Sequence, residues 1–267
     1  FSFFATVQAA LWAGLNVRFY DIGEHGCLVP NREGLMLDRY IWLAVHLYGR
    51  PAELPLRRTV VEDSAQAHGL PLRGLAACHS FYPSKNLGAW GQAGAVVTND
   101  ADMAMMVREG RAHGEHGRFV HYSLTGNHRM DELQAAVLRA KLPHLNDWNR
   151  ARQRVARVYL DKLKGLPGIK LPEEHPEHVY HIFAVRVTDR RGRGSLAQFL
   201  AASGIQTAVR YPVPLHLQPA LAHMGFRAGD FPMAEEWART NLSIPIYPEM
   251  SDEEVVYVVQ NIKEFLR

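Results

Sequence analysis

A short stretch around one lysine constrains this chain more than any other part of it. Residues 76–82 form an apolar segment of strand type, Pro83 ends it, and Lys85 follows two residues later. Burial at the end of a strand removes water from a lysine, lowers the pKa of its amine and makes the amine available as a nucleophile. Such lysines form Schiff bases with carbonyl compounds, including pyridoxal phosphate. A single lysine after a strand is more often an exposed loop residue, so this pattern alone leaves both interpretations open.

A second apolar strand ends in a carboxylate and favours the reactive interpretation. Residues 59–63 (TVVED) end at Asp63, and Gln66 follows three residues later. Pyridoxal chemistry needs an anion that keeps the pyridine nitrogen protonated, so that the ring can withdraw electrons, and Asp63 suits that role. Gln66 could hydrogen-bond the phenolic oxygen of the same cofactor. Together with Ser80 and Lys85, these side chains predict two strand ends that face one crevice, where open α/β sheets bind ligands.

Five segments follow one another along the chain in a characteristic order: VVEDSAQAHG, SFYPSKNLGAWGQAGAVVTND, GNHRMDELQAAVLRAKL, YPVPLHLQPAL and LSIPIYPEMSDEE. They resemble the motif series of the DegT/StrS-type aminotransferases, which are fold-type I pyridoxal phosphate enzymes that aminate keto sugars attached to nucleotides. The resemblance runs from Phe1 to the C-terminus. It implies an α/β fold, with a mainly parallel sheet flanked by helices in a large domain and a smaller C-terminal α+β domain.

The resemblance also implies roles for individual residues of the large domain. Lys85 would hold the cofactor and then move a proton during amino transfer, while Asp63 would keep the pyridine ring protonated. Phe3 would stack on the ring, and Ser80 would bind the cofactor phosphate. Asn127 would reach across a dimer interface to the phosphate of the neighbouring site, which implies a homodimer with shared active sites. From the residues alone, Phe3 could instead pack in the core and Asn127 could be a helix cap or turn residue.

Three residues of the second half match positions on the substrate side of the family's site. Tyr211 precedes the proline-rich segment 212–216 and His216 is its last residue. This segment is predicted to be rigid because proline fixes its own backbone angle and restrains the preceding residue. His181 is the third candidate, and packing or a surface loop is the alternative for each of them. The implied substrates are a nucleotide-linked keto sugar and an amino acid donor, with glutamate as the expected donor.

The sequence departs from the family pattern in three places. The family carries, ahead of the position of Phe1, a Gly-Thr turn leading into a helix whose N-terminus holds the cofactor phosphate, and this chain has no such turn. The chain is therefore expected to be either incomplete or a truncated relative with a weakened phosphate site. Residues 50–58 leave little room for a crossover helix between parallel strands, which puts the packing of one sheet face in question. Gln92 stands where the family usually has an acidic residue.

Two alternatives to an active aminotransferase follow from these observations. The departures favour a degenerate, non-catalytic family member that keeps the fold and acts as a structural or partner subunit. A sugar dehydratase of the same family is disfavoured, because those enzymes replace the lysine with histidine and this chain keeps Lys85.

Composition and spacing argue against several other classes. The formal net charge is +3 over 267 residues and the basic residues are scattered, so a nucleic-acid surface is not expected. Cys27 and Cys78 lack the spacing of a disulfide framework or a metal site, which favours a reducing compartment and a cytoplasmic location. No apolar run approaches the roughly 18 residues of a membrane span. His113 and His116 lie among glycines rather than in a helical metal-binding motif, so no metal is expected.

Hydrophobic periodicity predicts the remaining elements and a division into two domains. Helices are expected at residues 6–15 (with Thr6 as N-cap), 101–112, 132–142 and 143–163, and further strands at 16–22, 41–48 and 93–98. The predicted large, cofactor-binding domain comprises residues 1–145 and the small domain residues 146–267, with a strand at 179–187, a helix at 195–202 and a strand at 205–211. Ser251 and Glu254 predict a capping box at the start of the last helix.

Overall fold

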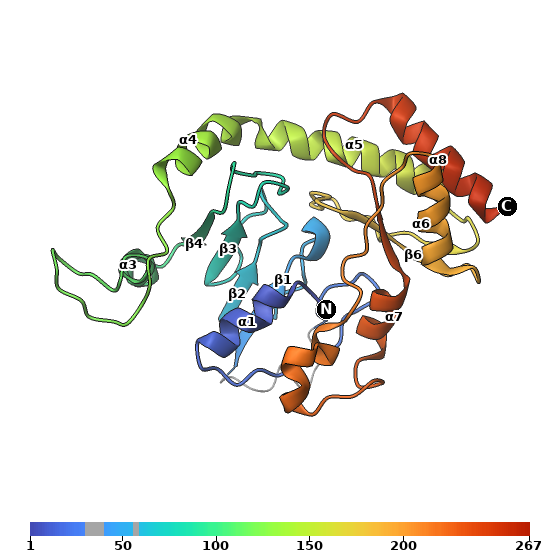
Figure 1. The fold of residues 1–267 in the computed structure, drawn as a ribbon. Coiled ribbons are helices and arrows are strands. Elements are labelled where there is room, and N and C mark those ends of the chain that lie inside the picture. Colours follow the sequence, from blue (N-terminus) through green and yellow to red (C-terminus); the bar gives the residue numbers. More distant parts are fainter. Residues whose placement is uncertain (30–39, 56–58) are drawn as a thin grey trace.

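A mixed β-sheet forms the framework of the first half of the chain. The computed structural model describes residues 1–29, 40–55 and 59–267. Within these residues the sheet has four strands, β1 (Ile41–Val45), β2 (Thr59–Asp63), β3 (Ala76–Ser80) and β4 (Gly94–Thr98), in that spatial order. Strands β1, β2 and β3 run parallel and β4 is antiparallel to β3 (Figure 1). The fold class predicted from the sequence is confirmed.

The strand register places the candidate site residues on one face of this sheet. Side chains alternate between the two faces along a strand, and paired residues share a face. Asp63 is paired with Cys78 of β3, so Asp63 and Ser80, two residues beyond Cys78, lie on the same face. The opposite face is buried and contributes Trp42, Ala44 and Val60 to a hydrophobic cluster.

The second half of the chain is built around a smaller antiparallel sheet. In the described residues its strands are β5 (Ile169–Lys170), β6 (Phe183–Val187) and β7 (Asn241–Ile244). Three helices share a hydrophobic core with this sheet, namely α5 (Leu145–Leu163), α6 (Gly192–Ala202) and α8 (Asp252–Leu266). The predicted capping box is confirmed, because the Ser251 hydroxyl accepts from the Glu254 backbone and the Glu254 carboxylate accepts from the Ser251 backbone.

The two sheets are joined by a common hydrophobic cluster. Trp237 of helix α7 (Pro232–Thr240) and Ile182, next to β6, belong to the same cluster as Trp42 of β1. The predicted domain boundary at residue 145 coincides with the first residue of α5, and it stays a prediction. Short 3-10 helices complete the connections: η1 (Leu47–Gly49), η2 (Leu142–His144), η3 (Leu215–Leu217) and η4 (Pro219–Met224).

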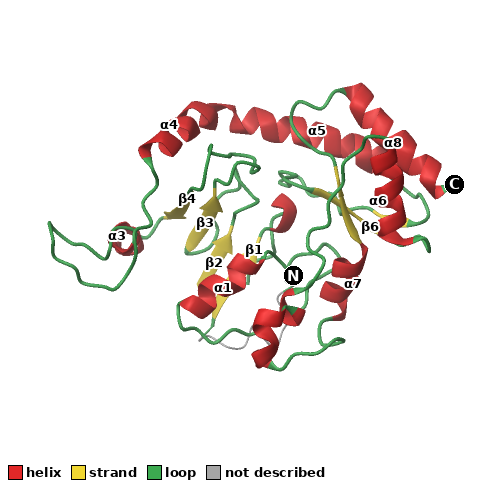
Figure 2. Ribbon diagram, viewed as in Figure 1, coloured by secondary structure: helices red, strands yellow, loops and turns green. Residues whose placement is uncertain are grey.

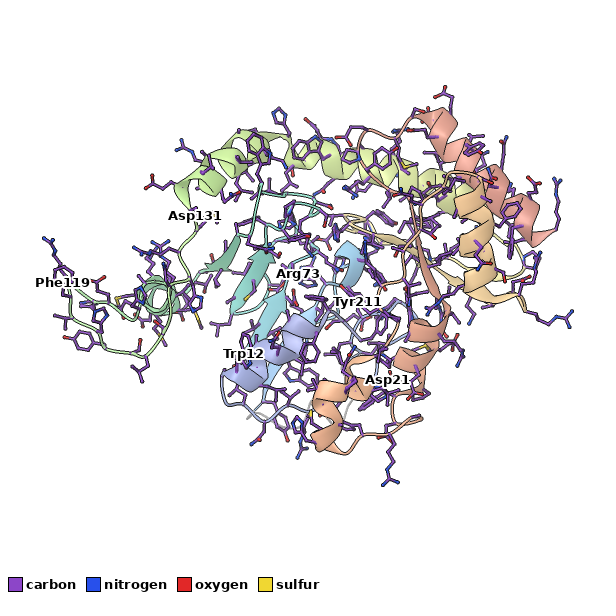
Figure 3. The ribbon with its side chains drawn as sticks, viewed as in Figure 1. Trp12, Asp21, Arg73, Phe119, Asp131 and Tyr211 are labelled. Carbon is purple, nitrogen blue, oxygen red and sulfur yellow. The ribbon has the colours of Figure 1, made fainter. Side chains whose placement is uncertain are left out.

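Residues 101–131 extend away from the first sheet as an arm that consists of α3 (Ala101–Gly110) and a long loop. Helix α4 (Glu132–Lys141), which follows the arm and leads into α5, packs through Leu138 against Leu87 of the loop after β3. Figures 1 and 2 show the loop projecting from the body of the molecule, and Figure 3 shows Phe119 near its outer end. Phe119 is 77% exposed and Leu124 is fully exposed, so large apolar side chains of the arm meet solvent in the single chain.

Several predicted elements differ from the structure. Residues 16–22 form no strand and make a single bridge, Ile22 to Leu28, because no described strand pairs with the rest of the segment. The strand expected at 41–48 ends at Val45, where the chain turns into η1. Residues 205–211 also make one bridge only, from Ala208 to Ser243. Within the described part of the chain, no helix is long and apolar enough to cross a membrane.

The first helix begins earlier than expected, and this correction bears on the site. Helix α1 (Phe4–Trp12) has Phe3 as its N-cap residue rather than Thr6. Thr6 therefore lies inside the first turn. Its hydroxyl donates a hydrogen bond to Asp63 at 2.7 Å, so that α1 lies beside the carboxyl end of β2.

Candidate active site

Asp63 is held in a defined orientation at the carboxyl end of β2. Its Oδ2 accepts from the Thr6 hydroxyl at 2.7 Å, and its Oδ1 accepts from the backbone of Ala65 at 3.1 Å. The Thr6 hydroxyl in turn accepts from Ser2 at 3.1 Å. Each carboxylate oxygen keeps a further lone pair, so Asp63 can accept a hydrogen bond from a ligand without losing those that orient it.

Lys85 lies in a tightly folded loop that follows β3. The Lys85 backbone donates to Tyr82 at 2.9 Å, and Ala89 donates to Phe81 at 2.8 Å, which closes the loop. A Cβ atom at Gly88 would lie 2.3 Å from the Pro83 carbonyl oxygen, so only glycine fits there. The fold of this loop thereby fixes the position of Lys85 relative to the end of β3.

The environment of Lys85 favours its free amine. Burial lowers the pKa of the amine below its ordinary value; the Asp63 carboxylate opposes this shift and the Arg210 guanidinium adds to it. Lys85 and Asp63 thus act on each other electrostatically, yet no ion pair joins them among the described residues. An amine and an oriented carboxylate that lie at adjoining strand ends without direct contact have the chemistry to hold two different atoms of one ligand.

Gln66 and Tyr211 form a second pair of groups near Asp63. Gln66 accepts from the Tyr48 backbone at 2.6 Å and donates to the Tyr211 hydroxyl at 3.1 Å, so its amide is oriented. The Tyr211 ring lies 5.7 Å from the ring of Phe3 (Figure 3 labels Tyr211). Phe3 itself is 59% exposed, which shows that it does not pack in the core and leaves its ring available to a ligand.

Ser80, Asn127 and His216 occupy three different environments. The Ser80 oxygen accepts only a long contact of 3.4 Å from Tyr82, and its hydroxyl hydrogen has no acceptor in the described residues. Asn127 lies on the exposed arm, where it accepts from Arg129. His216 is buried and bonded to Glu235 at 3.0 Å, and no contact with Lys85 is found in the described chain. The structure therefore brings Ser80, but neither Asn127 nor His216, to the sheet face of Asp63.

Two basic residues near Lys85 were missed in the sequence. His68 is 2% exposed, its ring lies 5.3 Å from that of His79, and neither of its nitrogens has a partner in the described structure. Burial, aided by the charges of His79 and Lys85, lowers the pKa of His68 to about 3, so it is neutral. Arg210 is exposed, and its guanidinium makes no ion pair within the described residues. In the sequence, the signal that could have identified Arg210 is its position directly before Tyr211, which is a candidate substrate residue.

A cavity of about 190 Å³ adjoins the site without being part of it. It lies between α1, residues 15–22 and β1, and most of its lining is apolar. Ser2 and Thr6 reach it, whereas Asp63 and Lys85 do not line it. The polar groups that converge on the strand ends, rather than this cavity, define the candidate active site.

Comparison with known proteins assigns the chain to a family. The model of the DegT/DnrJ/EryC1/StrS aminotransferase family matches residues 1–263. The chain belongs to this family. The resemblance seen in the sequence is thereby confirmed over almost its whole length.

Individual relatives agree with the family assignment. The erythromycin biosynthesis sensory transduction protein EryC1 of Saccharopolyspora erythraea is 45% identical over 83% of this chain. A dTDP-3-amino-3,4,6-trideoxy-alpha-D-glucose transaminase of Streptomyces venezuelae is 43% identical over 88% of it. The structure of NtdA from Bacillus subtilis, with bound cofactor PMP, superimposes with a TM-score of 0.89 at 28% identity and covers 99% of the chain. The chain spans 64%, 68% and 66% of these three proteins, respectively.

The residues present fit the cofactor that the family uses, pyridoxal phosphate, of which PMP is the aminated form. The donor set has the required chemistry: an amine with a lowered pKa, an oriented carboxylate and a hydroxyl with a free hydrogen. Lys85 would hold the aldehyde carbon, Asp63 the pyridine nitrogen and Ser80 the phosphate. When bound, the cofactor supplies an electron-withdrawing ring.

Proposed function

We propose that this chain carries the active site of a pyridoxal-phosphate-dependent aminotransferase. It transfers an amino group from an amino acid, with glutamate as the expected donor, to a keto sugar linked to a nucleotide. The observation that carries the proposal is the placement of Lys85 and Asp63 at adjoining strand ends, where they interact across a gap. The named function of the Streptomyces venezuelae relative supports the substrate class.

Lys85 has two tasks in this proposal. Its lowered pKa keeps a larger fraction of the amine unprotonated at neutral pH, which is the form that bonds to an aldehyde. With the cofactor bound, the free amine of Lys85 would hold and move the proton that leaves the donor's α-carbon. General acid–base catalysis of this kind contributes roughly 10²- to 10⁴-fold.

The surrounding residues orient the cofactor rather than react. Thr6 orients the Asp63 carboxylate, which would keep the pyridine nitrogen of a bound cofactor protonated. Phe3 presents an exposed ring for stacking. Gln66 already donates one amide hydrogen to Tyr211 and keeps a second one for the phenolic oxygen of the cofactor.

The substrate side is assigned to Tyr211 and His181. Tyr211 lies beside Phe3, and His181 is bonded to Asn86, the neighbour of Lys85. His216 has a positioning role in this proposal: its bond to Glu235 fixes the segment that follows Tyr211.

A homodimer with shared sites completes the proposal. Asn127 lies on the exposed arm, where its side chain bonds only to Arg129 among the described residues, and in this proposal it serves the phosphate of a partner's site. Exposed apolar residues of the same arm, Phe119 and Leu124, support burial against a second copy. Sedimentation should then give a dimer, and Asn127→Ala should weaken cofactor binding without removing the bond to Lys85.

One spectroscopic experiment separates this proposal from a non-catalytic family member. The protein mixed with pyridoxal phosphate should develop a visible absorption band that borohydride abolishes. Lys85→Ala should lack the band, whereas Lys164→Ala, which removes an exposed lysine after α5, should keep it. A protein that stays colourless would contradict the proposed function and favour the non-catalytic alternative. If the band forms, a panel of nucleotide-linked keto sugars with glutamate tests the transfer itself.

A further inference from the structure

A buried chain of hydrogen bonds connects the Lys85 loop to helix α5 and to His181. Asn86, the residue after Lys85, donates through Nδ2 to Asn149 Oδ1 at 2.9 Å and to the Val179 carbonyl at 3.0 Å. Asn149, on α5, donates through its own Nδ2 to the His68 carbonyl at 2.9 Å. Both asparagine side chains are buried. These contacts tie together segments that are far apart in sequence.

Backbone carbonyls fix the orientation of both amides. A carbonyl oxygen can only accept a hydrogen bond, so the group facing it must be the NH₂ of the asparagine. The amide atom of Asn86 that faces the Val179 carbonyl is therefore Nδ2, and the amide atom of Asn149 that faces the His68 carbonyl is also Nδ2. Exchange of oxygen and nitrogen in either amide would place an oxygen against an oxygen. The remaining atom of Asn86, Oδ1, is thus an acceptor.

This assignment determines the tautomer of His181. Nδ1 of His181 lies 3.1 Å from Asn86 Oδ1, and because that oxygen can only accept, Nδ1 must carry the hydrogen. Burial lowers the pKa of His181 well below its ordinary value, with the charges of Lys85 and Arg152 adding to the effect, so the ring is neutral. Nε2 then has a lone pair and no hydrogen.

Nε2 of His181 is available to a ligand. It makes no hydrogen bond within the described residues, and His181 is a half-buried residue. Its ring is anchored to the residue next to Lys85. A neutral ring with a bare lone pair attracts a group that donates a hydrogen and repels a carboxylate or phosphate oxygen.

We infer that Asn86 and Asn149 are positioning residues that hold His181 as a hydrogen-bond acceptor beside Lys85, where its Nε2 receives a hydroxyl group of the sugar substrate. The hydroxyl part of this inference rests on the proposed function, whereas the tautomer does not. The recognised chemistry is an uncharged donor close to the carbon that is aminated.

The tautomer is tested by ¹⁵N NMR of histidine-labelled protein, with and without pyridoxal phosphate, and His181→Gln identifies the signals. We expect a protonated, pyrrole-type Nδ1 and an unprotonated, pyridine-type Nε2. Asn86→Leu removes the acceptor of Nδ1 and should abolish this preference for the Nδ1 tautomer. Asn261→Leu, at a buried asparagine of α8, is the matched control. A wild-type signal with the hydrogen on Nε2 overturns the inference whether or not the protein is an enzyme.

The ligand is tested by steady-state kinetics with both substrates. His181→Leu should raise KM for the keto sugar about threefold to tenfold, the loss of one neutral hydrogen bond, and leave KM for glutamate unchanged. His181→Gln offers an amide acceptor and should recover part of the loss. If KM for glutamate rises as much as that for the sugar, His181 acts only through the Lys85 loop and the hydroxyl assignment is wrong. Absence of any transfer by the wild type contradicts the proposed function and leaves the NMR result standing.

Discussion

Replacement of Glu62 by glutamine should destabilise the fold although the side chain keeps its size. Glu62 and His46 are 1% exposed, and their side chains are 2.7 Å apart. His46 Nδ1 accepts from the Ala52 backbone at 2.9 Å, so Nε2 carries the hydrogen and donates to Glu62 Oε2. Oε1 of Glu62 accepts from the backbones of Arg73 and Gly74. One carboxylate therefore serves three donors, the buried His46 ring and two partly buried backbone amides, and these bonds link β1, β2 and the connection to β3.

Glutamine cannot satisfy these donors. The single oxygen of glutamine can face the two backbone amides or it can face His46. In either orientation its NH₂ group faces a donor on the other side. His46 cannot exchange tautomers, because a hydrogen on Nδ1 would oppose the Ala52 N–H. At least one buried donor loses its acceptor, which costs about 1–3 kcal/mol. At roughly 2–4 °C per kcal/mol for a chain of this size, Tm should fall by about 2–12 °C.

Calorimetry of the cofactor-free protein at pH 7 measures this change. Asp147→Asn is the control, because it removes a carboxylate from an exposed pair in which Arg150 and Asp147 are 69% and 66% exposed. A surface pair contributes less than about 1 kcal/mol. Equal shifts of Tm for Glu62→Gln and Asp147→Asn would refute the reasoning.

The same variant has an expected pH dependence. Burial raises the pKa of Glu62, but the hydrogen bonds from His46, Gly74 and Arg73 together outweigh burial, and the pKa lies below the ordinary value of 4.5. A lowered pKa stabilises the fold above the unfolded-state pKa, and this contribution is lost as the pH falls through the folded-state pKa. The difference in Tm between wild type and Glu62→Gln should therefore shrink below pH 4.5.

Three further predictions follow from other contacts. Arg210→Gln should raise the pKa of Lys85, because a nearby positive charge is removed, and absorbance titration with pyridoxal phosphate should show binding shifted to higher pH; a shift to lower pH would contradict the assignment. Ser251→Ala removes the capping box of α8 and should cost about 0.5–2 kcal/mol in urea unfolding, against no change for a substitution in the exposed loop of the arm. Leu200→Ala, in the hydrophobic core of the smaller sheet, should lower the free energy of unfolding by about 2–5 kcal/mol. A loss under about 1 kcal/mol would show that the core collapses around the cavity.

The sequence was sufficient to predict that Asp63 ends one strand and that Lys85 follows the end of another. Two apolar segments with polar residues at their ends predict parallel strands whose carboxyl ends meet at one edge, and the register places Asp63 and Ser80 on one face. By contrast, the alternation at residues 16–22 and 205–211 was misleading. A strand needs a partner along its whole length, and these segments have one bridge each.

The sequence by itself determined the family and the fold class, through the resemblance of its five motif segments to a known series. It also placed the lysine and the carboxylate at two strand ends, because these depend on local patterns and short spacings. Only the tertiary structure decided which groups surround them. Thr6 reaches Asp63 across 57 residues, and His181 reaches Asn86 across 95. Such contacts arise where segments that are distant in sequence pack together, and no pattern within one segment encodes them. The tautomer of His181 and the burial of His68 are therefore properties of the folded chain.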